Sequence, residues 1–392
     1  MSLLPRRSPL AIIFLTVFID LIGFGIVIPV LPLYAERFGA SPLIIGLLLS
    51  SYSAMQALCA PLLGKLSDRV GRRPVLLISL LGTAAGFLLM GLANTLWLLF
   101  IARIIDGATG GNIAAAQAYI ADVTRPEERS KGMGLIGAAF GLGFIFGPAI
   151  GGLLSHLSLS APFFFAAALT AANAAALYFL LPESLAPALR GHARRHLAVA
   201  EVFHEGHRRT LLTVIATYCL ATVAFSLLTA TYPLFTEHRF GYDARHNGLI
   251  FAGQGILGAI VQGVLMGYLV LRLGERRLII IGVALLGLGL FVLPLSATML
   301  LLLMATAGIA LGHSFLAAPL NGLASKSVAA DSQGRVLGLM QSAASVARII
   351  GPVLGGWLLG ADAVRLAVAY GQTPYWVGAG IMCAALMLAW IL

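Results

Sequence analysis

Charged side chains are scarce in this chain of 392 residues. Asp, Glu, Lys and Arg together make up only 10% of the sequence, whereas hydrophobic residues make up 59% and the mean hydropathy is +0.96. Soluble domains carry about 25% charged residues, so this chain has too few to cover a surface that faces water. The composition therefore excludes a soluble enzyme, a soluble nucleic-acid-binding protein and a disordered chain, and it indicates a membrane protein.

Cysteine is rare as well. The three cysteines, Cys59, Cys219 and Cys383, each lie alone within an apolar run. No pair has the spacing of a disulfide framework or of a metal site, and an isolated cysteine in such a run usually packs as a small hydrophobic residue. The sequence also lacks a phosphate-binding loop and the pattern of a catalytic triad. We therefore expect no metal, no cofactor and no enzymatic activity, so that a gradient must supply any energy the protein uses.

Long apolar segments fill most of the chain. A helix needs roughly 20 apolar residues to cross the hydrocarbon core of a bilayer, and twelve segments meet that length. One longer polar connection, 186–210, separates six of them from the other six. We therefore predict an all-α membrane protein with an N-terminal six-helix bundle (1–185), a linker loop (186–210) and a C-terminal six-helix bundle (211–392). The predicted spans are 10–32, 43–63, 74–93, 96–120, 132–154, 162–181, 211–235, 246–269, 277–296, 299–322, 335–358 and 372–392.

Lysine and arginine are distributed unevenly between the two sides of these spans. If the N-terminus is cytoplasmic, 19 of the 25 basic residues fall in cytoplasmic loops and 4 in external loops, while Arg103 and Arg348 lie within spans. Cytoplasmic loops of membrane proteins are enriched in Lys and Arg. The split predicts that both termini and the linker are cytoplasmic, in the inner (plasma) membrane. The net charge of +10 is thus a signal of topology, and no nucleic-acid partner is expected.

The two halves of the chain repeat each other. A shift of 203 residues places 63–73 over 266–276, and a shift of 204 places 134–152 over 338–356, with Gly147-Pro148 falling on Gly351-Pro352. Because each half contains an even number of spans, both halves start on the same side of the membrane. The repeats are therefore parallel, as in transporters whose halves are related by an axis along the membrane normal.

Several segments resemble the sequence motifs of the major facilitator superfamily, and together they cover nearly the whole chain. GKLSDRVGRR at 64–73 resembles motif A, Arg103 with Gly107 resembles motif B, and GAAFGLGFIFGPAIGG at 137–152 resembles the antiporter motif C. FIDLIGFGIVIPVLP at 18–32 and LPES at 181–184 add to the likeness. Within the superfamily the chain resembles the twelve-span drug/proton antiporters, and is similar to the tetracycline/proton antiporters and their multidrug-efflux relatives.

This resemblance implies a secondary active transporter that exports small amphiphilic drugs or metabolites in exchange for protons by alternating access, and thereby confers antibiotic resistance. Its expected partners are a small-molecule substrate, protons and the lipid bilayer, and we expect a monomer. Tetracycline exporters carry further carboxylates in spans 3 and 9, whereas 82–91 and 279–288 have none, which argues against tetracycline itself. One alternative is a major facilitator transporter of another substrate class, such as a sugar, siderophore or lipid-like exporter, or a facilitator. Another is a receptor or scaffold without transport.

Four charged residues lie within the predicted spans: Asp20, Arg103, Asp106 and Arg348. A charge at the centre of a span costs about 2.5–3.5 kcal/mol on insertion scales, so each is a functional candidate. At about 1.5 Å of rise per residue, all four lie near the middle of the bilayer and are expected to share one cavity. We assign proton coupling to Asp20, Arg103 and Asp106, with Asp20 as carrier or, alternatively, as a structural salt-bridge partner. Asp106 is either a second proton site or a plain partner of Arg103.

Uncharged polar side chains within the spans are weaker candidates for lining the substrate cavity. Any one of them serves equally well as an interhelical hydrogen bond. They are Gln56, Asn112, Gln117, Gln254, Gln262, His313, Asn321 and Gln341, together with the charged Arg348.

The likeness to motif A implies a gate on the cytoplasmic side. In that interpretation Asp68 and Arg72 latch onto neighbouring helix ends, with Asp122 as the third member, and the Asp68 carboxylate meets the positive N-terminal end of span 11. Such a latch favours the outward-open state. The predicted gate residues are Gly64, Asp68, Arg69, Gly71, Arg72, Arg73 and Asp122.

The likeness to motif C concerns the approach of helix backbones. Glycines remove side chains from one face of span 5, so that another helix can approach closely, and proline permits a bend. This pattern serves either ordinary tight packing or a gate. The residues are Gly143, Gly147, Pro148, Gly151 and Gly152.

Overall fold

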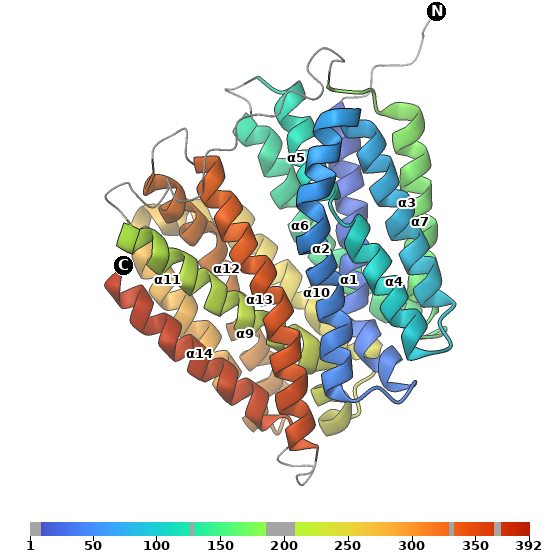
Figure 1. Ribbon diagram of the computed structural model, residues 1–392. Coiled ribbons are helices and arrows are strands. Elements are labelled where there is room, and N and C mark those ends of the chain that lie inside the picture. Colours follow the sequence, from blue (N-terminus) through green and yellow to red (C-terminus); the bar gives the residue numbers. More distant parts are fainter. Residues whose placement is uncertain (1–8, 126–128, 186–207, 329–332, 364–369) are drawn as a thin grey trace, which may run out of the picture.

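The first half of the computed structural model consists of helices joined by short connections (Figure 1). The structure describes residues 9–125, 129–185, 208–328, 333–363 and 370–392, and every regular element among them is helical. The helices of this half are α1 (Pro9–Glu36), α2 (Pro42–Val70), α3 (Arg72–Gly91), α4 (Leu96–Thr109), α5 (Asn112–Val123), α6 (Arg129–Ser155) and α7 (Ala161–Leu180).

The second half follows the same plan. It contains α9 (Arg208–Phe240), α10 (Ala244–Ile260), the π-helical turn η3 (Val261–Leu265), α11 (Met266–Val292), the short 3₁₀ turn η4 (Leu293–Leu295), α12 (Met299–Lys326), α13 (Gln333–Asp362) and α14 (Gln372–Ile391). Most of the predicted linker 186–210 lies outside the described residues, and its last three residues begin α9.

The described residues form eleven helical segments long and apolar enough to cross a membrane, and one of these makes two crossings. The segment Ala244–Leu295 is 52 residues long, and its helix is broken at Gly274, where φ is 76° and ψ is 160°. A positive φ is accessible to glycine at little steric cost. Counting both parts of this segment gives the twelve predicted spans, and the predicted all-α fold of two six-helix pseudo-repeats is confirmed.

The predicted fourth span, 96–120, differs from the structure in its continuity. Instead of one helix there are two, α4 and α5, which are separated at Gly110 and Gly111. Two consecutive glycines are unfavourable in a helix interior because the unfolded chain has so much conformational freedom there. The break exposes the backbone carbonyl of Gly110, which accepts a hydrogen bond from Gln56 Nε2 at 2.9 Å.

The internal repeat of the sequence reappears in the geometry. Gly71, between α2 and α3, also has a positive φ of 115°, and it is the residue that the shift of 203 places on Gly274. The helices that contain the two Gly-Pro pairs also match. A Cβ atom built on Gly147 would lie 2.7 Å from the Cα of Gly25 in α1, and one on Gly351 would lie 2.7 Å from the carbonyl oxygen of Val223 in α9.

The two halves meet mainly through α2, α6, α10 and α13, and the closest contacts lie towards one end of the molecule. A Cβ on Gly152 of α6 would lie 3.0 Å from the Cα of Gly248 in α10, and one on Gly356 of α13 would lie 2.3 Å from the carbonyl oxygen of Pro42 in α2. Ser50 of α2 donates a hydrogen bond of 2.7 Å to the carbonyl of Ile349 in α13. These contacts join the ends of the halves that lie away from the start of α1. We call that end the closed face.

At the other end, where α1 begins, the ribbons of the halves diverge (Figure 1). The earlier turns of α6 and α13 have open space beside them, because a Cβ built on Gly134, Gly137, Gly141 or Gly338 would meet no atom within 4 Å. We call this end the open face and the space between the halves the opening. Buried apolar clusters form the core. One lies around Leu227 and Leu286 in the second half, and two lie around Leu31 and around Val75 in the first; the first two of these clusters also include residues from the opposite half.

Candidate functional site: a charge cluster between the halves and a network at the open face

The buried ion pair of α4 is the centre of the candidate site. Arg103 Nη1 lies 3.0 Å from Asp106 Oδ2, and their side chains are only 3% and 6% exposed. The two residues are three positions apart, which places them on one face of the helix. Small residues let the neighbouring helices come close: a Cβ on Gly107 would lie 2.4 Å from the Tyr52 carbonyl oxygen. The Arg103 guanidinium lies 4.3 Å from the centroid of the Tyr52 ring, a cation–π contact.

Asp20 of α1 joins this pair. A small cavity of about 10 Å³ is lined by Asp20, Phe24, Tyr52, Thr83, Phe87 and Asp106. Asp20 lies within electrostatic range of Asp106 and hydrogen-bonding reach of the buried Asn112 side chain. The structure therefore brings the three predicted proton-coupling residues together, and it adds lining residues that the sequence patterns did not indicate: Phe24, Tyr52, Thr83 and Phe87. The position of Tyr52, one helical turn before Gln56, was the only signal for it.

The fourth predicted charge, Arg348, lies on α13 in the other half. It is partly buried and donates a hydrogen bond of 3.1 Å to Ser345 Oγ. Within the described part of the chain, no carboxylate lies within 4.0 Å of its guanidinium. Tyr52 lies within electrostatic range of all four charges. The four charges therefore gather around one tyrosine at the junction of the two halves.

The predicted polar lining residues divide into several groups. Gln56 is used structurally, because its amide donates to Gly110 O and to the Tyr52 hydroxyl. The Nε2 atom of Gln254 is buried without a hydrogen-bond partner in the described chain, and the His313 ring stacks on Phe225 with centroids 3.9 Å apart. Of the remaining members, Gln117, Gln262 and Gln341 are exposed, Asn321 is partly exposed, and Asn112 is buried beside Asp20. In the parts of the chain that the structure describes, no three side chains are grouped as metal ligands.

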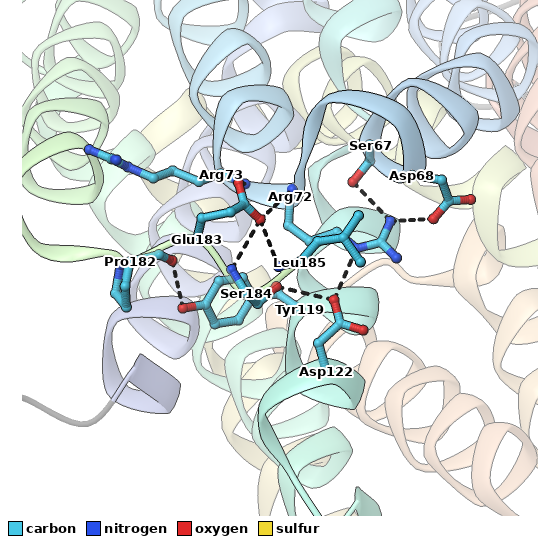
Figure 2. Close-up of polar contacts among 10 residues, drawn as sticks. All are labelled: Ser67, Asp68, Arg72, Arg73, Tyr119, Asp122, Pro182, Glu183, Ser184 and Leu185. Carbon is cyan, nitrogen blue, oxygen red and sulfur yellow. Dashed lines mark hydrogen bonds and ion pairs between the residues drawn. The ribbon is translucent and has the colours of Figure 1, made fainter. Parts of the chain in front are cut away.

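Four of the predicted gate residues belong to a network at the open face, drawn in Figure 2: Asp68, Arg72, Arg73 and Asp122. Arg72 is its centre: Nη1 donates to Asp68 Oδ1 at 2.5 Å and Nε donates to Asp122 Oδ2 at 3.1 Å. Asp68 is half exposed, and Arg72 is its only polar partner among the described residues. The predicted contact of Asp68 with the start of span 11 is thus not made in this open conformation.

Glu183, directly after α7, holds the start of α3. Its carboxylate accepts the backbone N–H groups of Arg72 and Arg73 at 2.9 and 3.1 Å, and also those of Ser184 and Leu185 at 3.0 Å (Figure 2). The first N–H groups of a helix have no partner within the helix, and the helix dipole favours an anion there. This role was missed from the sequence, where only the LPES motif pointed to the residue.

The Glu183 contact explains one of the two motif-A glycines. A Cβ built on Gly71 would lie 2.4 Å from Glu183 Oε2, and the residue has a positive φ as well. Gly64, in contrast, has no atom within 4 Å of such a Cβ. Further bonds attach the chain after α7 to α5, since Ser184 Oγ donates to Asp122 and Tyr119 donates to the Pro182 carbonyl. The network therefore joins α2, α3, α5 and the chain that precedes the predicted linker.

The fold and the charged site between two pseudo-symmetric halves define a membrane transporter. The family model of the Major Facilitator Superfamily matches residues 13–265 and 244–392, so the chain belongs to that family. Over 357 residues it is 37% identical to the class C tetracycline resistance protein of Escherichia coli, and the match covers 89% of each chain. It is 30% identical over 362 residues to multidrug resistance protein 2 of Bacillus subtilis (strain 168), covering 91% of this chain and 90% of the relative.

The solved structures agree on the fold. A bacterial homolog of the human lysosomal transporter Spinster, in an inward-facing and occupied conformation, superposes with a TM-score of 0.81 at 16% identity, covering 100% of this chain and 97% of that one. The predicted resemblance to the drug/proton antiporters, and to the tetracycline and multidrug resistance proteins among them, is confirmed. The protein is a multi-pass membrane transporter of small molecules and not an enzyme.

Proposed function

We propose that the protein is a proton-coupled antiporter that exports small amphiphilic drugs or metabolites. The observation that carries this proposal is the meeting of two carboxylates, Asp20 and Asp106, at one small cavity beside the buried Arg103. Two carboxylates so close together are unfavourable when both are ionised, so one of them tends to hold a proton. The names of the relatives, tetracycline and multidrug resistance proteins, support drug export.

The two carboxylates differ in their partners, and this difference assigns a different role in proton coupling to each. Asp106 lies 3.0 Å from the Arg103 guanidinium, which compensates its negative charge. Asp20 has no cation within 4.0 Å in the described chain. We therefore assign the transported proton to Asp20. Arg103 and Asp106 together keep that proton exchangeable by setting the field in which Asp20 titrates.

The packing of the halves supports a mechanism of alternating access. Glycine contacts hold α2 against α13 and α6 against α10 at the closed face, while the other end is open. Rocking of the halves about the central site would open one face and close the other. With the basic loops in the cytoplasm, the present conformation opens inwards, and both termini are cytoplasmic. In the other state Asp68 would reach the start of α13. We propose that one chain, with domains 1–185 and 211–392, is the functional unit.

Transport in inverted membrane vesicles tests this function. An imposed proton gradient should drive uptake of some members of a panel of fluorescent dyes and antibiotics, including tetracycline, and a protonophore should abolish that uptake. Vesicles without the protein are the control. If no amphiphile in the panel is taken up in a gradient-dependent way, the drug-export proposal is wrong and the alternative of another substrate class takes its place.

A further inference from the structure

Two charges of opposite sign remain without an ionic partner at the junction of the halves. Arg103 and Asp106 neutralise each other and are almost fully buried. In the described chain, Asp20 in the first half has no cation within 4.0 Å, and Arg348 in the second half has no carboxylate within that distance. Both are partly buried, and Tyr52 lies within electrostatic range of each. An uncompensated charge inside a membrane protein is costly, so these two side chains point to a ligand that compensates them.

Arg348 belongs to a polar stripe that faces the opening. Gln341, Ser345 and Arg348 are four and three positions apart and lie on one face of α13. Gln341 is exposed, and the other two are partly exposed. One turn earlier on the same face, a Cβ atom built on Gly338 would meet no atom within 4 Å. Polar side chains at this depth that are not fully buried face a water-filled space and not lipid.

The matching helix of the first half has no such stripe. The shift of 204 residues places Gly137 on Gln341, Gly141 on Ser345 and Phe144 on Arg348. Gly137 and Gly141 also border open space. Since the two halves share their fold and their glycine contacts, this difference in side chains breaks the symmetry of the opening. One wall carries a cation, and the carboxylate that lacks a partner comes from the opposite half.

We propose that the transported class is amphoteric: an aromatic or otherwise apolar body that carries both an acidic and a basic group. The acidic group binds the Arg348 guanidinium, which is suited to bidentate recognition of carboxylates. The basic group binds Asp20, and the Tyr52 and Tyr218 rings near Arg348 contact the apolar body. A purely cationic ligand would leave Arg348 uncompensated, and a purely anionic one would be repelled by Asp20.

This assignment rests on the proposed antiport and supplies its coupling. The amine of the substrate and the transported proton compete for one carboxylate, Asp20, so each displaces the other, as exchange requires. The ligand also spans both halves, because Asp20 lies on α1 and Arg348 on α13. Binding at both ends therefore draws the two walls of the opening together.

Matched probes test the proposal on the purified full-length protein. Ciprofloxacin carries a distant amine and carboxylate, and Nε-dansyl-lysine carries adjacent ones. Each is compared by fluorescence anisotropy with its ethyl ester, which is cationic, and its N-acetyl derivative, which is anionic. At least one amphoteric probe should bind about 10- to 100-fold more tightly than both of its derivatives, since a hydrogen bond to a charged group contributes on that scale.

Variants assign the two ends. Arg348→Gln should remove the advantage over the ester while leaving the affinity of the ester itself within about 2-fold, and Arg348→Lys should keep part of the advantage. Asp20→Asn should remove the advantage over the N-acetyl derivative. Arg209→Gln, an exposed arginine at the start of α9, is the control and should keep all ratios. Ratios between probes do not depend on the fraction of folded protein.

Equal binding of the three forms of both probes, no binding of either amphoteric probe, or an advantage that survives Arg348→Gln would overturn the amphoteric assignment. A separate measurement tests the antiport: proton-driven uptake of any dye in proteoliposomes. If that uptake is present without the amphoteric preference, only the substrate class is wrong. If the preference is present without gradient-driven uptake, the proton coupling is wrong.

Discussion

The two acidic residues of the central cluster illustrate how neighbours decide the role of a side chain. Asp20 and Asp106 have the same chemistry and line the same small cavity. Asp106 is fixed by a guanidinium three residues earlier on its own helix, whereas Asp20 lies near the Asn112 side chain and Asp106 and has no cation within 4.0 Å among the described residues. In the proposed mechanism, the first arrangement holds a charge in place, and the second allows a proton to bind and leave.

Asp20→Asn is expected to abolish uphill, proton-driven export and to leave some downhill exchange. Substrate affinity of the wild type should fall as the pH is lowered through the titration of Asp20, because protonation removes the charge that binds the amine. In the variant, affinity should be almost independent of pH. Uptake in inverted vesicles and binding titrations across a pH series measure both effects. The control is Asp243→Asn, which changes an exposed residue at the closed face. Uphill export that survives in the variant would transfer the carrier role to Asp106.

Removal of the arginine from the buried ion pair should damage the fold. Arg103→Gln leaves the Asp106 carboxylate buried without its partner, which costs about 3–5 kcal/mol when such a pair is broken. The double variant Arg103→Gln with Asp106→Asn replaces the ion pair by two neutral polar side chains, which leaves no buried charge unpaired, and it should recover part of the lost stability. Thermal unfolding in detergent compares the three proteins. A double variant no more stable than the single one would contradict this account of the pair.

At the scale of helices, the same glycine turn occurs in both halves of the chain, but its ionic neighbours differ between them. Gly71 and Gly274 occupy equivalent places with positive φ. Only the first turn lies against a carboxylate, that of Glu183. In the second repeat, Glu275 next to the glycine pairs with Lys326 at 2.8 Å. The backbone geometry is thus common to both repeats, while the ionic contacts around it are specific to each.

Gly71→Ala should destabilise the start of α3. Its Cβ would lie 2.4 Å from Glu183 Oε2, and a non-glycine residue at positive φ is strained by about 1–2 kcal/mol or more. Gly64→Ala is the matched control from the same motif, because its Cβ would meet no atom within 4 Å. The melting temperature should fall for Gly71→Ala and stay constant or rise for Gly64→Ala. Equal melting temperatures would show that the Glu183 contact does not constrain this turn.

Asp68→Asn should reduce transport strongly with little effect on substrate binding or on stability. Asp68 is half exposed and pairs only with Arg72 among the described residues, so this conformation loses a weak surface contact of about 0–1 kcal/mol. The closed inner gate, in contrast, loses an anion at the helix N-terminus of α13. Transport rates, binding affinity and melting temperature separate these effects. A loss of binding with unchanged populations of the two conformations would refute the gate role.

At the scale of the whole molecule, the parts that the sequence predicts are those set by local patterns. Apolar length predicts the spans, and the repeat predicts that Gly71 matches Gly274 and that Gly147 matches Gly351. The role of Glu183 could not be predicted, because its partners lie about 110 residues away in the chain and meet it only after folding. The use of Gln56 as a backbone partner depends on a helix break at Gly110 that was not expected. Which face is open also escapes prediction, because two packings of the same halves differ by little free energy.

Because the molecule has an open face and a closed face, it should show a specific pattern of cysteine labelling. In a protein with its native cysteines replaced, Gly141→Cys borders the opening and has space for its side chain. If the open face is cytoplasmic, this cysteine should react with a membrane-impermeant thiol reagent in inverted vesicles and remain unreactive in intact cells. Ala200→Cys, in the predicted linker, should behave in the same way, and Phe240→Cys at the closed face should react in intact cells. Labelling at 200 and 141 from outside, without labelling at 240, would mean that the protein lies in the membrane the other way round.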